Sequence, residues 1–117
     1  MKAIISKEGL TVEELPFFVR NDVGYNIVFT IKQDNDSIVS LSGATVRFKL
    51  KNISTDVVKV NRECTLDNPT SGICSYKPAT GDLDTQGVYD AELEVITSGG
   101  TIINTIKLGR VTILEDI

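Results

Sequence analysis

Residues 83–95 read L-D-T-Q-G-V-Y-D-A-E-L-E-V, and in their second half apolar and acidic side chains alternate strictly. The apolar residues share one side of an extended chain and are Tyr89, Ala91, Leu93 and Val95. The acidic residues share the other side and are Asp90, Glu92 and Glu94. A period of two predicts a β-strand with one face in the core and one face in water.

Gly87 and Tyr89 follow an acidic turn at the start of this strand. In immunoglobulin-like sandwiches the strand that closes the core often begins with such a corner. The tyrosine ring is buried there, and its hydroxyl bonds back to the upstream backbone. We therefore expect Tyr89 to be a buried corner tyrosine.

A second alternation occupies residues 46–51. Its apolar members are Val46, Phe48 and Leu50, and its cationic members are Arg47, Lys49 and Lys51. In an immunoglobulin-like sandwich these two strands are antiparallel neighbours, which sets three cations opposite three carboxylates. Each such pair contributes about 0.2 to 1 kcal/mol, so the pairs select the neighbour more than they stabilise the sheet. The alternative is that both rows are ordinary solvated faces.

The remaining strands are expected on both sides of this pair. Ala3–Ile5 is predicted to be a short edge strand, and Leu10–Val19, which Pro16 interrupts, to be irregular or an edge strand. Tyr25–Lys32 alternates clearly and is predicted to be a strand. Ile38–Leu41 is expected to return to the core after a polar turn, and Asp56–Val60 to pair with the strand before it.

Two hairpins complete the pattern. Arg62–Leu66 and Ile73–Lys77 flank a turn rich in Pro and Gly, and if Leu66 lies opposite Gly72, then Cys64 lies opposite Cys74. Both thiols then point inward. Three interpretations of the pair are open: two buried free thiols, a cross-strand disulfide, and a redox pair.

The last hairpin turns at Ser98-Gly99-Gly100. Pairing Ile96 with Ile103 brings Leu93 opposite Ile106 and Ala91 opposite Leu108. Val111 and Ile113 can face inward only if one residue is inserted, and Gly109 is the natural place for a β-bulge.

Length and charge bound the function. The 117 residues fit one domain, which we expect to span residues 1–117, and the net charge of -4 argues against a nucleic-acid partner. The chain has no histidine, which excludes histidine-dependent catalytic triads and most zinc sites. The first ten residues lack a signal-peptide core, so we expect synthesis in the cytoplasm and no membrane partner.

No catalytic, cofactor-binding or metal-binding residues are expected. The acidic turns at Asp34 and Asp36 and at Asp82 and Asp84 lack the glycine and glutamate spacing of a calcium loop, so solvated turns are the better interpretation. The carboxylates of residues 90–94 lie on an open face and not in a cleft, which argues against glycoside hydrolysis.

Four segments carry a family resemblance: F-T-I-K-Q-D-N at 29–35, L-S-G-A-T-V-R-F-K-L at 41–50, C-T-L-D-N-P-T-S-G-I-C-S-Y at 64–76, and G-D-L-D-T-Q-G-V-Y-D-A-E-L-E-V at 81–95. Over roughly residues 20–115 the chain resembles the immunoglobulin-like N-terminal domain of tailed-phage baseplate upper proteins and related small virion proteins. The resemblance implies an all-β, immunoglobulin-like antiparallel sandwich of about seven to nine strands. It also implies a location in the virion after synthesis in the host cytoplasm.

The function that the resemblance implies is a non-enzymatic structural protein of a tailed-phage particle. We expect an adaptor module on the tail or baseplate, present in multiple copies in a symmetric assembly and bound to other virion proteins. Longer family members continue into trimerising and host-recognition parts, which argues against a direct receptor-binding role here. The alternatives are a head decoration, cement or neck protein, and a carbohydrate-binding or adhesion module. Residues 1–19 are either an edge strand or a docking segment, since Leu15, Phe17, Phe18 and Val19 are unusually apolar for a loop.

Overall fold

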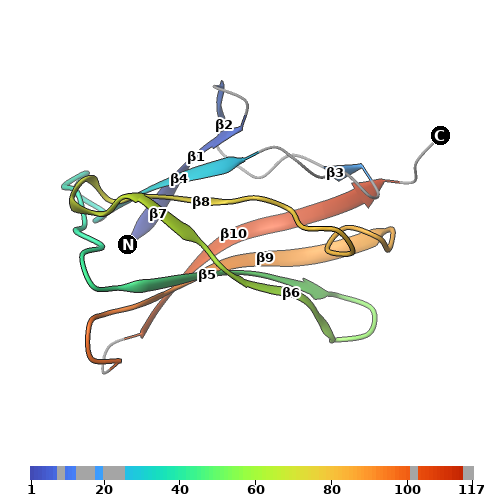
Figure 1. Ribbon diagram of the computed structural model, residues 1–117. Helices are drawn as coiled ribbons and strands as arrows, with labels where there is room; N and C mark the ends of the chain where they lie inside the picture. The colour runs from blue at the N-terminus through green and yellow to red at the C-terminus, as the bar shows by residue number, and fades with distance from the viewer. Residues whose placement is uncertain (8–9, 13–17, 20–25, 101–102, 115–117) are drawn as a thin grey trace.

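The computed structural model describes residues 1–7, 10–12, 18–19, 26–100 and 103–114. Within these residues the chain forms two β-sheets that pack face to face, as Figure 1 shows, and one short 3-10 turn, η1 (Pro69–Ser71). In the same ranges no helix has the length and apolar character needed to cross a membrane.

Sheet one has the strand order β2-β1-β4-β8-β7. Its members are β1 (Lys2–Lys7), β2 (Leu10–Val12), β4 (Ile27–Lys32), β7 (Thr65–Asn68) and β8 (Ile73–Tyr76). Sheet two has the order β3-β10-β9-β5-β6. Its members are β3 (Phe18–Val19), β5 (Thr45–Asn52), β6 (Val58–Glu63), β9 (Gly87–Ile96) and β10 (Ile103–Leu114).

Neighbouring strands are antiparallel except for β3, which runs parallel to β10. The order β1-β4-β8-β7 against β10-β9-β5 is the arrangement of an immunoglobulin-like sandwich. The predicted fold class is therefore confirmed. The described residues form ten strands, since the short pieces β2 and β3 join the sheet edges.

The core lies between the sheets and contains the alternating residues that the sequence indicated. Phe48 of β5 stacks on Tyr76 of sheet one, with ring centroids 4.2 Å apart. The four alternating residues Tyr89, Ala91, Leu93 and Val95 of β9 are buried. The register between β9 and β5 pairs Lys49 with Glu92 and Phe48 with Leu93. Tyr89 is only 1% exposed, and its hydroxyl donates a 2.8 Å hydrogen bond to the Thr85 carbonyl oxygen. The corner tyrosine is confirmed.

The N-terminal part differs from expectation. The strand predicted at Ala3–Ile5 is not an edge: β1 pairs with β4 along Lys2–Lys7 and with β2 through Ile5–Lys7. The edge strand next to β1 is β2, and the edge strand next to β10 is β3; both fall inside the segment Leu10–Val19. Pro16 and Tyr25 lie outside the described residues.

Two further expectations need correction between β4 and β7. Leu41 is buried as predicted, but Ile38 is exposed because it follows a tight turn and makes only an isolated bridge to Lys32. The strand predicted at Asp56–Val60 begins later and continues to Glu63, since Asp56 has a φ of 62° that a strand does not accommodate.

The predicted hairpin at 62–77 is split between the sheets. Glu63 ends β6 in sheet two, Thr65 begins β7 in sheet one, and the Cys64 amide donates a 2.7 Å bond to the Val46 carbonyl where the chain crosses over. The register pairs Thr65 with Ser75 instead of Cys64 with Cys74. The expected register was wrong because the turn is shorter than expected, with Asn68 opposite Ile73, and because an irregularity between Thr65 and Asn68 shifts the register.

The last strand pair agrees with its prediction up to the bulge. Ile103 pairs with Ile96 and Ile106 with Leu93, but Ala91 lies opposite Gly109 and not Leu108. The inserted residue is thus Leu108, one position before the predicted Gly109. Gly109 itself has a positive φ of 86°. Val111 and Ile113 return to the core as expected.

Candidate functional site

The outer surface of sheet two carries three rows of charge, which we call the charged face. The row on β5 consists of Arg47, Lys49 and Lys51; the row on β9 consists of Asp90, Glu92 and Glu94; the row on β10 consists of Lys107 and Arg110. The register sets Arg47 beside Glu94, Lys49 beside Glu92 and Lys51 beside Asp90. The predicted neighbours and register of the first two rows are confirmed.

The ion pairs between β9 and β10 follow the direct register pairs, whereas the cations of β5 do not bond the carboxylates directly beside them. Lys49 bonds diagonally to Glu94 at 3.0 Å, and Glu92 accepts a 2.7 Å bond from Lys107. Lys51 turns away to Asp56, while Asp90 has only a 3.6 Å contact with Arg110. Lys51 has a raised pKa, because Asp56 accepts its hydrogen bond and lies close to its charge. The third row was missed from the sequence, although the alternation of Thr105, Lys107 and Arg110 around the bulge contained its signal.

A depression of about 270 Å³ lies in the middle of the charged face. Its lining includes residues from the four longer strands of sheet two, among them Lys49 of β5, Val58 of β6, Glu92 of β9 and Lys107 of β10. Cations and carboxylates share this lining, so the depression suits a partner that presents both charges.

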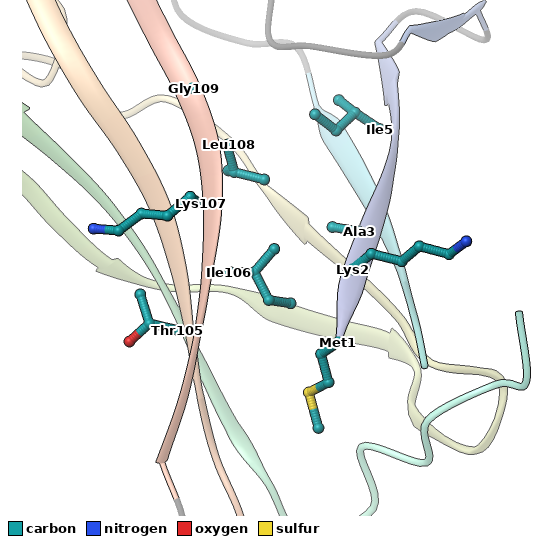
Figure 2. Close-up of a pocket in the computed structure, with 9 residues that line it drawn as sticks. All are labelled: Met1, Lys2, Ala3, Ile5, Thr105, Ile106, Lys107, Leu108 and Gly109. Atoms are coloured by element: carbon teal, nitrogen blue, oxygen red, sulfur yellow. The ribbon is translucent and has the colours of Figure 1, made fainter. Parts of the chain in front are cut away.

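A second hollow, of about 360 Å³, lies between β1 and β10 (Figure 2). In Figure 2 the side chains of Met1, Ile106 and Leu108 point into the space between the two strands, whereas Lys107 and Lys2 point away. In the described part of the chain, β10 is paired with β3 only through Ile113 and Leu114. The groove therefore lies beside unpaired stretches of strand edge, while Ile106 and Leu108 at its base are buried.

Asp82 is a buried carboxylate at the centre of a polar cluster that the sequence did not reveal. It is 4% exposed and accepts a bidentate pair of bonds from Arg62, a 2.8 Å bond from the Tyr76 hydroxyl and a bond from the Ala79 amide. Burial alone would raise the pKa of Asp82, but these donors outweigh it and the pKa is lowered. The expectation of a solvated turn was wrong here, because Arg62 lies twenty residues away and gave no local signal.

The other acidic turn residues pair with cations near the surface. Asp84 bonds Lys59 at 2.6 Å, and Asp36 bonds Lys2 at 2.6 Å; both partners lower the pKa of their carboxyl group. Across the described residues, no group of three or more His, Cys, Asp or Glu side chains could hold a metal ion.

Cys64 and Cys74 are both buried, as predicted, and both are free thiols in this structure. Their side chains interact even though the strand register does not pair them. The pKa of Cys64 is raised, first by its hydrogen bond with Cys74 and then by burial. A thiol held protonated in this way is a poor nucleophile.

The described aromatic side chains all lie in the core: Phe29, Phe48, Tyr76 and Tyr89. These four rings offer no exposed platform for stacking on a sugar. Of the apolar residues singled out near the N-terminus, Phe18 and Val19 form β3, and Leu15 and Phe17 lie outside the described residues.

Comparison with known proteins gives one family. The family model of the BppU N-terminal domain matches residues 7–110. A search of curated proteins found no match. Among solved structures, a family 123 glycoside hydrolase from Clostridium perfringens is 13% identical with a TM-score of 0.36; the alignment covers 87% of this chain and 22% of that chain. A TM-score this low supports no conclusion about fold or activity.

The family match extends over nearly the whole chain. The chain therefore belongs to the family of the N-terminal domain of phage baseplate upper proteins, a structural domain of phage baseplates.

Proposed function

We propose that this chain is a non-enzymatic adaptor module of a tailed-phage particle and that it attaches to the tail or baseplate by binding other virion proteins. The observation that carries the proposal is the family match across residues 7–110. The side chains of the structure support it, since the ion pairs of the charged face lie on the outer surface of sheet two and the described aromatic rings are buried. Such surfaces suit docking on a protein more than binding of a small ligand.

We further propose that residues 1–117 act as one sandwich domain and that the apolar segment around Leu15 and Phe17 contributes to docking. Deleting residues 1–19 would be a poor test, because β1 pairs with β4 along six residues and its loss would open sheet one. The double substitution Leu15→Ser and Phe17→Ser keeps β1 intact. If the segment docks on a partner, particles lose this variant while its free energy of unfolding stays near that of the parent. If the segment packs only on its own domain, the free energy of unfolding falls instead.

The location is tested by labelling particles. A short epitope inserted after Gly99 lies in an open turn, where an added Cβ meets no atom within 4 Å. Antibody-gold electron microscopy of purified particles is expected to show label at the tail tip. Label on the head or neck would overturn the baseplate location and favour a decoration or cement protein. Particles without label, from cells in which the tagged chain is folded, would overturn the assignment to the virion. Specific binding to a glycan array would favour the carbohydrate-binding alternative.

A further inference from the structure

The charged face has a pattern that is complementary to itself. Across the sheet the rows read positive on β5, negative on β9 and positive on β10, at matching heights along the strands. Asp90 is the least satisfied carboxylate, because it is more than half exposed and its Arg110 contact is long at 3.6 Å. A carboxylate has acceptor sites for more than one donor, so Glu92 and Glu94 can each bind a second cation without losing the first.

Two copies can lie face to face about a two-fold axis that runs parallel to the strands, between β5 and β9. This axis keeps every residue at its own height and exchanges the positions of the two strands. Since Lys49 lies beside Glu92 and Lys51 beside Asp90 within one sheet, each cation then meets the same carboxylate of the other copy. Six oppositely charged pairs follow by symmetry, three from each β5 row.

Other axes fit less well. An axis perpendicular to the strands sets β5 against β5, and an axis along β9 sets carboxylates against carboxylates. Like charges placed opposite each other in an interface disfavour that arrangement. An axis between β9 and β10 matches only two pairs per copy and leaves the β5 cations opposite the sheet edge. The charge pattern thus selects the axis between β5 and β9.

Exposed apolar residues lie at one end of the same face. Ile53, just past β5, is 39% exposed, and Val88 on β9 is 36% exposed; the Ile53 amide bonds the Val88 carbonyl, so the two are neighbours. The same two-fold axis sets Ile53 of one copy against Val88 of the other. Val58 lies on this face beside Lys51, and it is half exposed.

We propose that the charged face is the interface of a homodimer, in which a second copy of this chain docks about the two-fold axis between β5 and β9. Each Lys49 and Lys51 then pairs with Glu92 and Asp90 of the other copy, and Ile53 packs on Val88. The inference goes beyond the proposed function and is tested on the purified chain, so its failure leaves the proposed function untouched.

The size of the face sets the strength of the dimer. Four strands about 4.8 Å apart, each about eight residues long at about 3.3 Å per residue, cover about 500 Å² per copy. A total near 1,000 Å² is at the lower limit of specific interfaces, so dissociation constants in the micromolar range or weaker are expected. Salt screens the exposed charges, so the dimer weakens as ionic strength rises.

The test uses sedimentation equilibrium of the full chain under reducing conditions, from micromolar to millimolar concentration. The acidic variant carries Lys49→Glu and Lys51→Glu, and the basic variant carries Asp90→Lys and Glu92→Lys. Alone, each variant has like charges at the proposed contacts and is expected to dissociate at least about tenfold more readily. An equimolar mixture has opposite charges at every one of these contacts, so a heterodimer is expected to form with roughly the parent affinity.

Folding of each variant is checked by circular dichroism. Val88→Ser is an independent probe of the interface. Its matched control is Ile38→Ser, because Ile38 is an exposed apolar residue outside the charged face. Val88→Ser is expected to weaken the dimer and Ile38→Ser to leave it unchanged. A parent chain that stays monomeric at millimolar concentration would overturn the proposal. So would an acidic variant that self-associates as the parent does, or a mixture that gains nothing over its components.

Discussion

Arg62 of β6 and Asp82 of the loop before β9 form a bidentate ion pair, with the shortest nitrogen to oxygen distance at 2.8 Å. Tyr76 of β8 donates to the same carboxylate, so one buried group connects a strand from each sheet with the loop that leads to the corner tyrosine. Loss of the negative charge would weaken the bonds from Arg62, Tyr76 and the Ala79 amide together.

The first prediction concerns that carboxylate. Asp82→Asn removes the charge that accepts bonds from Arg62, Tyr76 and the Ala79 amide. We expect the free energy of unfolding to fall by about 2 to 3 kcal/mol, because hydrogen bonds to a buried charged group are the costly ones to lose. Urea denaturation measures the change. Asp84→Asn is the matched control: its partner Lys59 lies near the surface, so this ion pair is screened by water and a clearly smaller loss than for Asp82→Asn is expected. Equal losses in the two variants would contradict the central role of Asp82.

The second prediction is the pH dependence of the same group. The folded pKa of Asp82 lies below its ordinary value of 3.8, so its contribution to stability is present above that value and is lost as the pH falls through the folded pKa. The difference in unfolding free energy between parent and Asp82→Asn should therefore be constant from neutral pH down to about pH 5 and should shrink below it. Urea titrations at several pH values measure this difference. A difference that grows on acidification would show that Asp82 is protonated in the fold.

The sandwich could be predicted because its information is local. Alternation at residues 46–51 and 89–95 specifies which faces are buried, and a short turn specifies the pairing of Ile96 with Ile103. The bulge before Gly109 was visible because the phase of the apolar residues changes there. What the sequence did not show depends on long-range contacts: the crossover at Cys64 and the pairing of Arg62 with Asp82. The charged face was predicted in part, since its first two rows lie in the alternating strands and the third follows the bulge.

The third prediction tests the corner hydroxyl. Tyr89→Phe keeps the buried ring and removes the donor of the 2.8 Å bond to the Thr85 carbonyl. We expect the free energy of unfolding to fall by about 1 kcal/mol, the usual net value of one such hydrogen bond. Thr85→Ala is the control, because it keeps the backbone acceptor and changes only an exposed side chain that bonds Asp84. If Tyr89→Phe is as stable as the parent in urea denaturation, the hydroxyl does not stabilise the corner.

The fourth prediction compares two glycines with similar left-handed backbones. Gly72 ends the 3-10 turn η1 with a φ of 74°, and Gly109 follows the bulge with a φ of 86°. Alanine at either position has the same backbone strain, about 1 to 2 kcal/mol. At Gly72 the added Cβ would also lie 2.7 Å from the carbonyl oxygens of Ile31 and Val39, whereas at Gly109 it meets nothing within 4 Å. Gly72→Ala should therefore lose more unfolding free energy than Gly109→Ala, and thermal or urea denaturation of both measures the difference. Equal losses would show that the η1 turn shifts freely and does not press on β4.

The last prediction concerns the two thiols. Cys64 and Cys74 are buried in contact with each other, and the raised pKa of Cys64 keeps that thiol protonated at neutral pH. Since the thiolate is the reactive form, iodoacetamide should label the folded chain slowly and modify both cysteines once guanidinium unfolds it. Cys74→Ala removes the hydrogen bond that contributes most to the raised pKa, but it leaves Cys64 buried. Labelling of Cys64 in this variant should therefore become faster with rising pH than in the parent while still requiring local opening. Mass spectrometry of the labelled chain follows both reactions. Rapid labelling of the folded parent would show that the strand crossover at Cys64 opens readily, which its 2.7 Å backbone bond to Val46 argues against.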